Sequence, residues 1–148
     1  MESFTAQEDT EDLTADTILE LLANRRRRYL LYGLRGRTEP VELSRLAETV
    51  AGWEHNVPPD EVAQNDYKSV YVSSVQCHVP KLADAGVVDH DTENHSVILS
   101  DTFEQLEPYL EIVVRDEPEN STLQGALDAE TKEGLIGSIR QNVAKLKH

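Results

Sequence analysis

The stretch that decides the fold is YKSVYVSSVQCHVPKLADAGVVDHDTENHSVILS, residues 67–100. Its first half predicts a helix over 67–85, because apolar side chains recur at helical spacing on one stripe: Val72, Val75, Val79 and Leu82. Gly86 is expected to end this helix, and Pro80 to kink it or loosen its last turn. The second half predicts a β-hairpin over 86–100, because turn-forming residues separate two β-rich runs.

Helical spacing of apolar residues also predicts helix over 14–34. Thr14 is a suitable N-cap, and Gly36 is placed to end the segment. The pattern is compatible with one unbroken helix or with two, the second of which would be capped by Asn24.

A shorter amphipathic helix is predicted over 41–50, beginning near Pro40 and ending at Gly52. Residues 53–66 follow, and they contain Pro58-Pro59, which fits neither a helix interior nor a central strand. We expect this segment to be irregular.

Two amphipathic segments follow the hairpin. A helix over about 102–114 carries an apolar stripe formed by Phe103, Leu106, Leu110 and Val113. After a linker at 116–121, a second helix carries Leu135, Ile139, Val143 and Leu146. Three glycines weaken this last helix, so it needs a partner surface. We expect these eight apolar residues to form a homodimer interface.

The chain has 148 residues, with 14 Lys and Arg against 28 Asp and Glu, and a net charge of −14. Its organisation is predicted as an acidic flexible tail over 1–13, one domain over 14–100 and a helical dimerisation region over 101–148. The acid excess repels itself in dilute buffer but not in concentrated salt, where the Debye length is short. This favours a halophilic source over a merely acidic protein.

Several function classes find no support in the sequence. A single cysteine excludes an internal disulfide and a multi-cysteine metal site, and no run reaches the roughly 18 apolar residues of a membrane span. The acidic N-terminus has no apolar core of a signal peptide, so a cytoplasmic location is expected. No phosphate loop, nucleophile turn or zinc motif is present, so we expect no enzyme activity, cofactor, metal or small-molecule ligand.

The order helix, helix, helix, hairpin, helix is that of a winged helix-turn-helix. LANRRRRYLLY (22–32) resembles the first helix of ArsR-type winged-helix regulators, LSRLAETV (43–50) their second, and VPKLADAGVV (79–88) the end of their recognition helix. The arginine run together with the His-x-Pro-Lys-Leu segment at 78–82 resembles an uncharacterised haloarchaeal winged-helix family. The resemblance covers about 14–100. It implies a mainly α fold with a β-hairpin wing, and a transcription regulator that is often dimeric.

The chain departs from that pattern in three ways. Roughly fourteen residues separate its second and third predicted helices, where a turn of three to four is usual. The wing carries Asp89, Asp91 and Glu93, where Lys or Arg would contact phosphates. Cys77 alone cannot rebuild the metal site of sensor members, so metal sensing is not implied, although a redox role of this thiol stays open.

Candidate DNA contacts lie on the outward face and flanks of the 67–85 helix, because their side chains can reach base edges or phosphates in a major groove: Lys68, Ser69, Ser73, Ser74, Gln76, Cys77, His78 and Lys81. The arginine run lies in a segment, 23–37, with a charge of +6 and no acid, which predicts phosphate contacts from Arg26, Arg27 and Arg28. An internal ion-pair network is an equally good interpretation of the arginines, and a solvated surface an alternative for the helix face.

The sequence therefore favours a sequence-specific DNA-binding transcription regulator of a halophilic archaeon, which binds double-stranded DNA as a homodimer. In concentrated salt, counterion release adds little to affinity, so a weak salt dependence is expected. The alternative is a winged-helix module that binds another protein and makes no DNA contact. The acidic wing and the long insertion favour that alternative.

Overall fold

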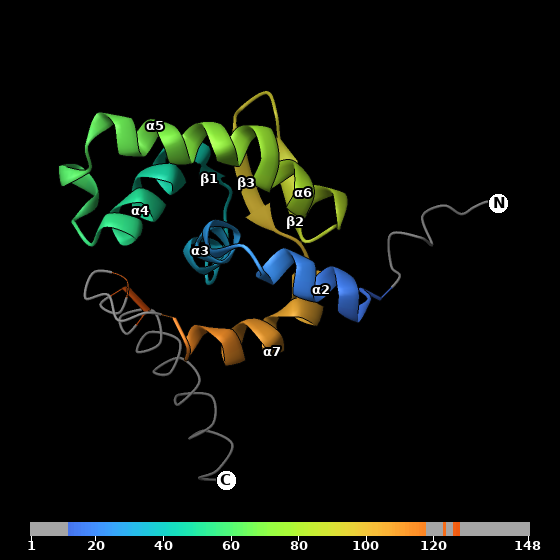
Figure 1. The fold of residues 1–148 in the computed structure, drawn as a ribbon. Helices are drawn as coiled ribbons and strands as arrows, with labels where there is room; N and C mark the ends of the chain where they lie inside the picture. The colour runs from blue at the N-terminus through green and yellow to red at the C-terminus, as the bar shows by residue number, and fades with distance from the viewer. Residues whose placement is uncertain (1–11, 118–122, 124–125, 128–148) are drawn as a thin grey trace, which may run out of the picture.

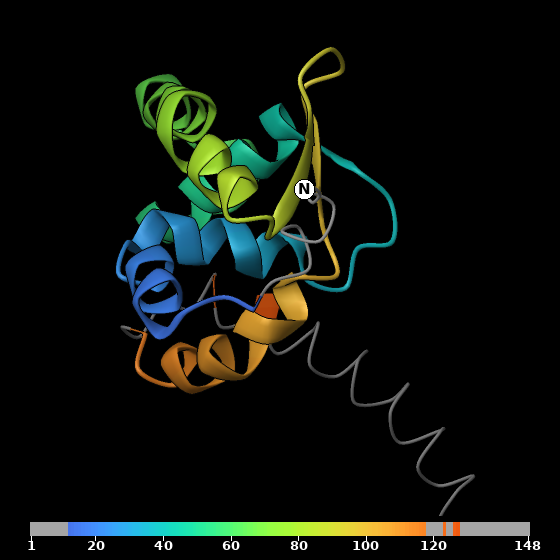
Figure 2. The ribbon, with the colours of Figure 1, turned by 90° about the vertical axis from the view of Figure 1, so that its right-hand side faces the viewer.

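The computed structural model of this chain describes residues 12–117, 123 and 126–127, whose arrangement is drawn in Figures 1 and 2. Its elements follow in the order α2 (Ala15–Leu22), α3 (Arg25–Leu34), β1 (Val41–Glu42), α4 (Leu43–His55), the 3₁₀ helix η1 (Pro59–Glu61), α5 (Gln64–Ser73), the π-helix η2 (Ser74–His78), α6 (Val79–Asp84), β2 (Val88–Asp91), β3 (Ser96–Leu99) and α7 (Phe103–Val114). The fold is mainly helical with a small three-stranded antiparallel sheet, so this part of the predicted fold class is confirmed.

Helix α3 lies in the middle of the molecule, with α4 to α6 on one side and α7 on the other (Figures 1 and 2). Its buried residues supply much of the core, because Tyr29, Leu30, Leu31, Tyr32 and Leu34 are each at most 2% exposed. Every element packed around α3 is therefore positioned by this one helix.

Two helices, not one, occupy residues 14–34. Thr14 caps α2, since its hydroxyl accepts from the Thr17 N–H at 3.1 Å. Asn24 caps α3 and accepts from the N–H groups of Arg26 and Arg27 at 2.9 and 3.2 Å. The cap at Asn24 therefore explains why the chain forms two helices here and not one continuous helix, a choice that the periodicity left open.

Strand β1 and the end of α4 differ from the prediction. β1 pairs with β3 through Val41 and Val97, and two residues are too short to produce a periodic signal. Helix α4 continues past Gly52 to His55 and stops at Asn56, whose φ is +56°. Gly52 is needed for close packing instead, because a Cβ there would lie 2.7 Å from the Val57 carbonyl oxygen.

The predicted helix over 67–85 is α5, η2 and α6, which run end to end along one side of the molecule (Figure 1). It begins at Gln64, within the segment predicted to be irregular, so residues 56–63 separate it from α4 and the predicted spacing of roughly fourteen residues is wrong. The π-helical segment η2 comes directly before α6, and the Val79 N–H donates to the Ser74 carbonyl, five residues back. Pro80 follows at once. A proline ring collides with the carbonyl four residues earlier in an α-helix, and the wider π turn relieves this contact.

The hairpin forms as predicted, with Val88 opposite Leu99 and Asp91 opposite Ser96. Helix α7 also forms, but its stripe is not a dimer surface as predicted. Phe103, Leu106 and Leu110 are at most 5% exposed and belong to the protomer's own core, while Val113 is half-buried against it. The stripe packs inward because α7 lies under α2 and α3. The other predicted interface residues, Leu135, Ile139, Val143 and Leu146, lie outside the described residues.

Within the described part of the chain, every helix is too short or too polar to cross a lipid bilayer.

Candidate nucleic-acid interface

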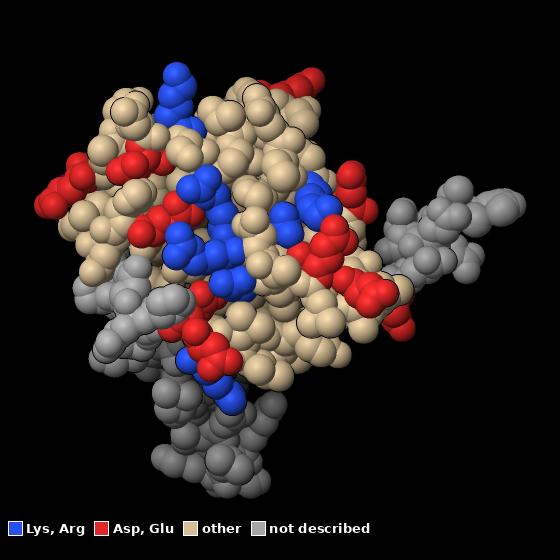
Figure 3. Space-filling model, in the orientation of Figure 1, with Lys and Arg blue, Asp and Glu red and all other residues tan. Residues whose placement is uncertain are grey.

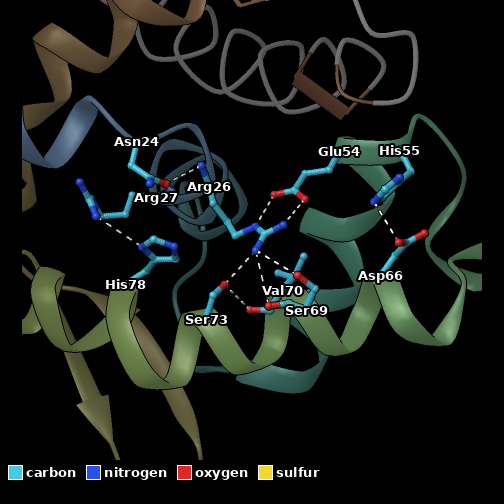
Figure 4. Close-up of polar contacts among 10 residues, drawn as sticks. All are labelled: Asn24, Arg26, Arg27, Glu54, His55, Asp66, Ser69, Val70, Ser73 and His78. Carbon is cyan, nitrogen blue, oxygen red and sulfur yellow. Dashed lines mark hydrogen bonds and ion pairs between the residues drawn. The ribbon is translucent and has the colours of Figure 1, made fainter.

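The four consecutive arginines at the start of α3 project toward different elements. Arg26 reaches α4 and α5, as Figure 4 shows. Its Nε and Nη2 atoms donate to both carboxylate oxygens of Glu54 at 2.6 Å each. Its Nη1 donates to the hydroxyls of Ser73 and Ser69 at 3.0 and 3.5 Å. Hydrogen bonding to Glu54 raises the pKa of Arg26, so this side chain is a permanent cation that holds α5 against α4.

Arg27 turns the other way and is only 7% exposed. Its Nε donates to the Leu21 carbonyl at 3.0 Å and its Nη2 to the Glu20 carbonyl at 2.8 Å. These carbonyls end α2, which has no basic residue in its own last turn. Arg27 therefore donates to two of the C-terminal carbonyls of α2 and complements the helix dipole.

Arg28 joins α3 to the segment after α7. It donates to Glu117 through Nε at 2.6 Å and to the Leu22 carbonyl at 2.7 Å. The Tyr32 hydroxyl donates to the same carboxylate at 2.6 Å. Burial and this negative neighbour raise the pKa of Tyr32, which stays protonated as the donor.

Two further arginines complete the picture. Arg25 lies over the ring of Tyr29, with its guanidinium carbon 5.7 Å from the centroid. Arg35 pairs with Glu107 and Glu111 on α7. The arginines therefore form an internal ion-pair network, which was the alternative interpretation of the arginine run. Arg26, Arg27 and Arg28 position helices, and their predicted phosphate contacts would require these pairs to break.

The exposed face of α5 and η2 lies next to this network. Its exposed residues are Lys68, Ser69, Val72, Gln76 and Cys77. With Asn65 and Ser73 they line a shallow groove of about 550 Å³. We call these five exposed residues the α5 face.

Two predicted contact residues are not on this face. Ser74 is fully buried and His78 is 7% exposed, whereas Val72, predicted to face the core, is 37% exposed. Val79 and Leu82 are buried and Val75 packs against the core, as predicted, but the inward stripe continues toward the start of the helix through His78, Ser74 and Val70 and not through Val72. The π turn explains part of this, because a π-helical turn holds about one residue more than an α-helical turn, so that before Val79 the side facing the core shifts by about one residue from the α-helical spacing.

Ser73 and Lys81 lie at the edges of the face with their groups engaged. The Ser73 hydroxyl accepts from Arg26 and donates to the Val70 carbonyl at 3.2 Å, which uses its single proton. Lys81 Nζ lies 2.8 Å from Glu20, and this contact lowers the pKa of that carboxyl. Lys68, Ser69, Gln76 and Cys77 are exposed as predicted.

His78 faces the arginine network from η2. Arg27 Nη1 lies 3.4 Å from its Nδ1, and a guanidinium only donates, so this ring nitrogen accepts and the proton sits on Nε2. Burial lowers the pKa of His78, and the charges of Arg27 and Arg26 lower it further. The imidazole is therefore neutral and acts as a packing group beneath the α5 face.

The sequence carried a signal for this surface that helical periodicity missed. Residues 21–38 and 67–83 contain no acid, in a chain with 28 of them. The structure brings the two stretches together, since Arg26 contacts Ser69 and Ser73, and Arg27 contacts His78. On this side of the molecule, basic side chains gather across the centre and acidic ones lie mainly toward the flanks (Figure 3).

A second groove, of about 870 Å³, lies between the segment after α3 and helix α4. Arg37 and Arg45 line it together with Glu39, Glu42 and Glu48. This mixture of charges selects neither an anion nor a cation. Among the described residues, no group of three or more His, Cys, Asp or Glu side chains is placed to hold a metal ion.

A family model described as a domain of unknown function, DUF7344, matches residues 19–98, more than half of the chain. The chain belongs to the DUF7344 family. The matched segment runs from within α2 to β3, so it contains the arginines of α3 and the α5 face, but neither α7 nor Glu117, with which Arg35 and Arg28 pair. Neither a curated protein nor a solved structure gives a significant match.

Proposed function

We propose that the chain is a DNA-binding transcription regulator that places the α5 face in the major groove of double-stranded DNA. One observation carries this proposal. In a chain with a net charge of −14, the α5 face contains no acid and offers the ammonium of Lys68, the amide of Gln76 and the hydroxyl of Ser69. These groups pair with phosphates and base edges.

The arrangement of elements supports the same proposal. β1 lies between α3 and α4 in the chain, and the sheet order is β1-β3-β2, with β2 and β3 joined as a hairpin. This order is compatible with a winged helix-turn-helix, and in our proposal the helix before the hairpin enters the groove. Here that helix is α5 with η2 and α6.

The arginines act mainly as positioning residues in this proposal. Arg26 fixes α5 through Ser69 and Ser73, and Arg27 fixes α2 against His78. Arg25 is exposed, and its guanidinium lies over the ring of Tyr29, a position from which it can reach a phosphate beside the groove. Direct phosphate contacts thus come from Arg25 and Lys68.

We further propose that the protein comes from a halophilic organism and acts as a homodimer. In this dimer the two protomers contact each other through the outer face of α7. The buried stripe of α7 is unavailable, but Tyr109 and Ile112 are 47% and 58% exposed on the same helix. Large apolar side chains at such exposure, close together on one helix face, suit a subunit contact. Two protomers would present two α5 faces to successive major grooves.

A protein-binding module without DNA contact is the second candidate. Asp89, Asp91 and Glu93 are exposed on the hairpin, where they would repel phosphates. Three of the four arginines at 25–28 are also engaged internally. Both observations favour a partner other than DNA.

Fluorescence anisotropy with labelled genomic fragments distinguishes the two candidates. We expect the full-length protein to bind specific fragments in about 2 M KCl, where unspecific charge attraction is screened. Lys68→Ala combined with Gln76→Ala should abolish specific binding. Ser74→Ala is the matched control, because Ser74 lies on the buried side of the same helix. Absence of binding at every salt concentration would reject the DNA proposal and favour the protein-binding module.

A further inference from the structure

We infer that Val72 reads the C5-methyl group of a thymine, so that the target of this protein contains a thymine at the centre of each half-site. The inference rests on the proposed DNA-binding function and adds to it the base that the α5 face selects. It starts from a side chain that neither the core nor the arginine network explains.

Val72 is an exposed apolar residue in the middle of a polar surface. Its side chain is 37% exposed, and the groove that it lines is otherwise bordered by polar or thiol side chains. The inward stripe of the same helix is already occupied by Val70 and Ser74, which are both fully buried. Val72 therefore does not belong to the core, although its spacing in the sequence suggested that it did.

The neighbours of Val72 fit a major groove better than an apolar peptide. Lys68 and Gln76 lie four residues before and after it, and both line the same groove. A lysine there suits the phosphate backbone or guanine, and a glutamine pairs with the N6 and N7 atoms of adenine. The thymine methyl is the apolar feature of the major groove, and an apolar side chain complements it.

The acid-rich composition favours a protein that works in concentrated salt, and in such salt an apolar contact with DNA has an advantage over a charged one. Concentrated salt screens the attraction between Lys68 and phosphates, whereas apolar burial is not screened. A methyl contact therefore keeps its contribution to specificity under conditions in which charge attraction has largely gone. An isopropyl group held at the surface of a rigid helix supplies that contact without a conformational change.

The experiment replaces thymine by deoxyuridine, which lacks only the methyl group. A target is first selected from random duplexes with the full-length protein in about 2 M KCl, and each thymine in it is then replaced in turn. For the wild type, one thymine in each half-site should be sensitive, with an affinity about fourfold lower per lost methyl contact. Val72→Ala should bind the thymine and deoxyuridine duplexes equally, with the affinity that the wild type has for deoxyuridine.

Control variants and salt separate this inference from the general proposal. Leu19→Ala removes an exposed apolar side chain from α2 and should keep the wild-type ratio of the two affinities. That ratio should also stay constant between about 0.5 and 3 M KCl, since the contact is uncharged. If a target is selected but deoxyuridine never weakens binding, or Val72→Ala keeps the wild-type ratio, the thymine inference is overturned while DNA binding stands. If no duplex is bound, the proposed function itself fails, and this inference with it.

Discussion

Arg27 donates a hydrogen bond to Nδ1 of His78 across 3.4 Å, and this contact ties the start of α3 to the π turn beneath the α5 face. A second positive charge at that distance from the guanidinium is unfavourable, so the pair is compatible only with a neutral imidazole. Arg26 adds to this effect, and Glu54 opposes it as the one negative group that acts on the ring. The site is built for one protonation state of His78.

The first prediction is a loss of stability in weak acid. Burial and Arg27 lower the pKa of His78 in the folded chain, below the ordinary value of 6.5 that applies when it is unfolded. Below about pH 6.5 the unfolded chain therefore binds more protons, and the free energy of unfolding falls with pH. Urea denaturation at a series of pH values around 6.5 measures how steeply the free energy of unfolding depends on pH. His78→Gln, whose amide oxygen still accepts from Arg27, should reduce this slope, whereas Gln76→Ala, at an exposed position of the same segment, removes no titratable group and should leave it unchanged.

The start of α2, the glycines that follow α3 and α6, and the hairpin were predictable because local chemistry decides them, whereas the end of α4 at Asn56 and the start of α5 at Gln64 were not predicted. Asn24 and Thr14 are capping residues, and Gly36 and Gly86 adopt φ values of +78° and +80° that favour glycine. These signals lie within a few residues of the structure they produce. Strand β1 gives no such signal, because its two residues form a strand only by pairing with β3, more than fifty positions later in the chain.

The site was harder to predict because long-range contacts define it. Arg26 bonds to Glu54, and Arg28 to Glu117, 28 and 89 positions away. Sequence spacing cannot show which arginine of the run meets which acid. The π turn is equally invisible to an analysis that assumes 3.6 residues per turn, which is why Val72 and Ser74 exchanged their predicted sides.

The second prediction concerns Ser74. Its hydroxyl is buried without a hydrogen-bond partner among the described residues. An unsatisfied buried hydroxyl is costly, so Ser74→Ala should raise the free energy of unfolding by about 1 kcal/mol. Ser69→Ala, on the exposed side of the same helix, should change it less. Thermal unfolding of both variants at one KCl concentration measures the two changes in stability. A marked loss of stability in Ser74→Ala would mean that the Ser74 hydroxyl makes a stabilising hydrogen bond after all.

The third prediction concerns Glu117, whose side chain is 1% exposed and accepts from both Arg28 and Tyr32. Glu117→Ala leaves the Arg28 cation without its carboxylate and should lower the free energy of unfolding by about 3 kcal/mol. Asp116→Ala, at the neighbouring exposed position, should have little effect. Equal losses from the two variants in urea denaturation would show that the pair contributes nothing specific.

The fourth prediction is a shallow salt dependence of DNA binding. Arg25 and Lys68 are the two cations of each protomer that we propose contact phosphates, so a dimer neutralises about four phosphates. The slope of log affinity against log salt should therefore be about −4 or shallower. Anisotropy titrations over a range of KCl concentrations measure it. Arg25→Ala should make the slope shallower still. A slope of about −7 would mean that Arg26 and Arg28 of both protomers also leave their carboxylates to bind phosphates.

The fifth prediction tests the revised dimer surface. Ile112→Lys places a charge on the exposed face of α7, and if that face joins two protomers, burying the unpaired charge should convert the dimer to a monomer. Light scattering of the full-length protein gives the mass directly. Leu19→Lys is the matched control, because Leu19 is 63% exposed on α2, outside the proposed contact. Both variants should keep the wild-type unfolding midpoint when the chain is monomeric, since neither side chain lies in the core.

A dimer that survives Ile112→Lys together with Tyr109→Lys would place the subunit contact elsewhere. DNA binding by two α5 faces would then need a different geometry.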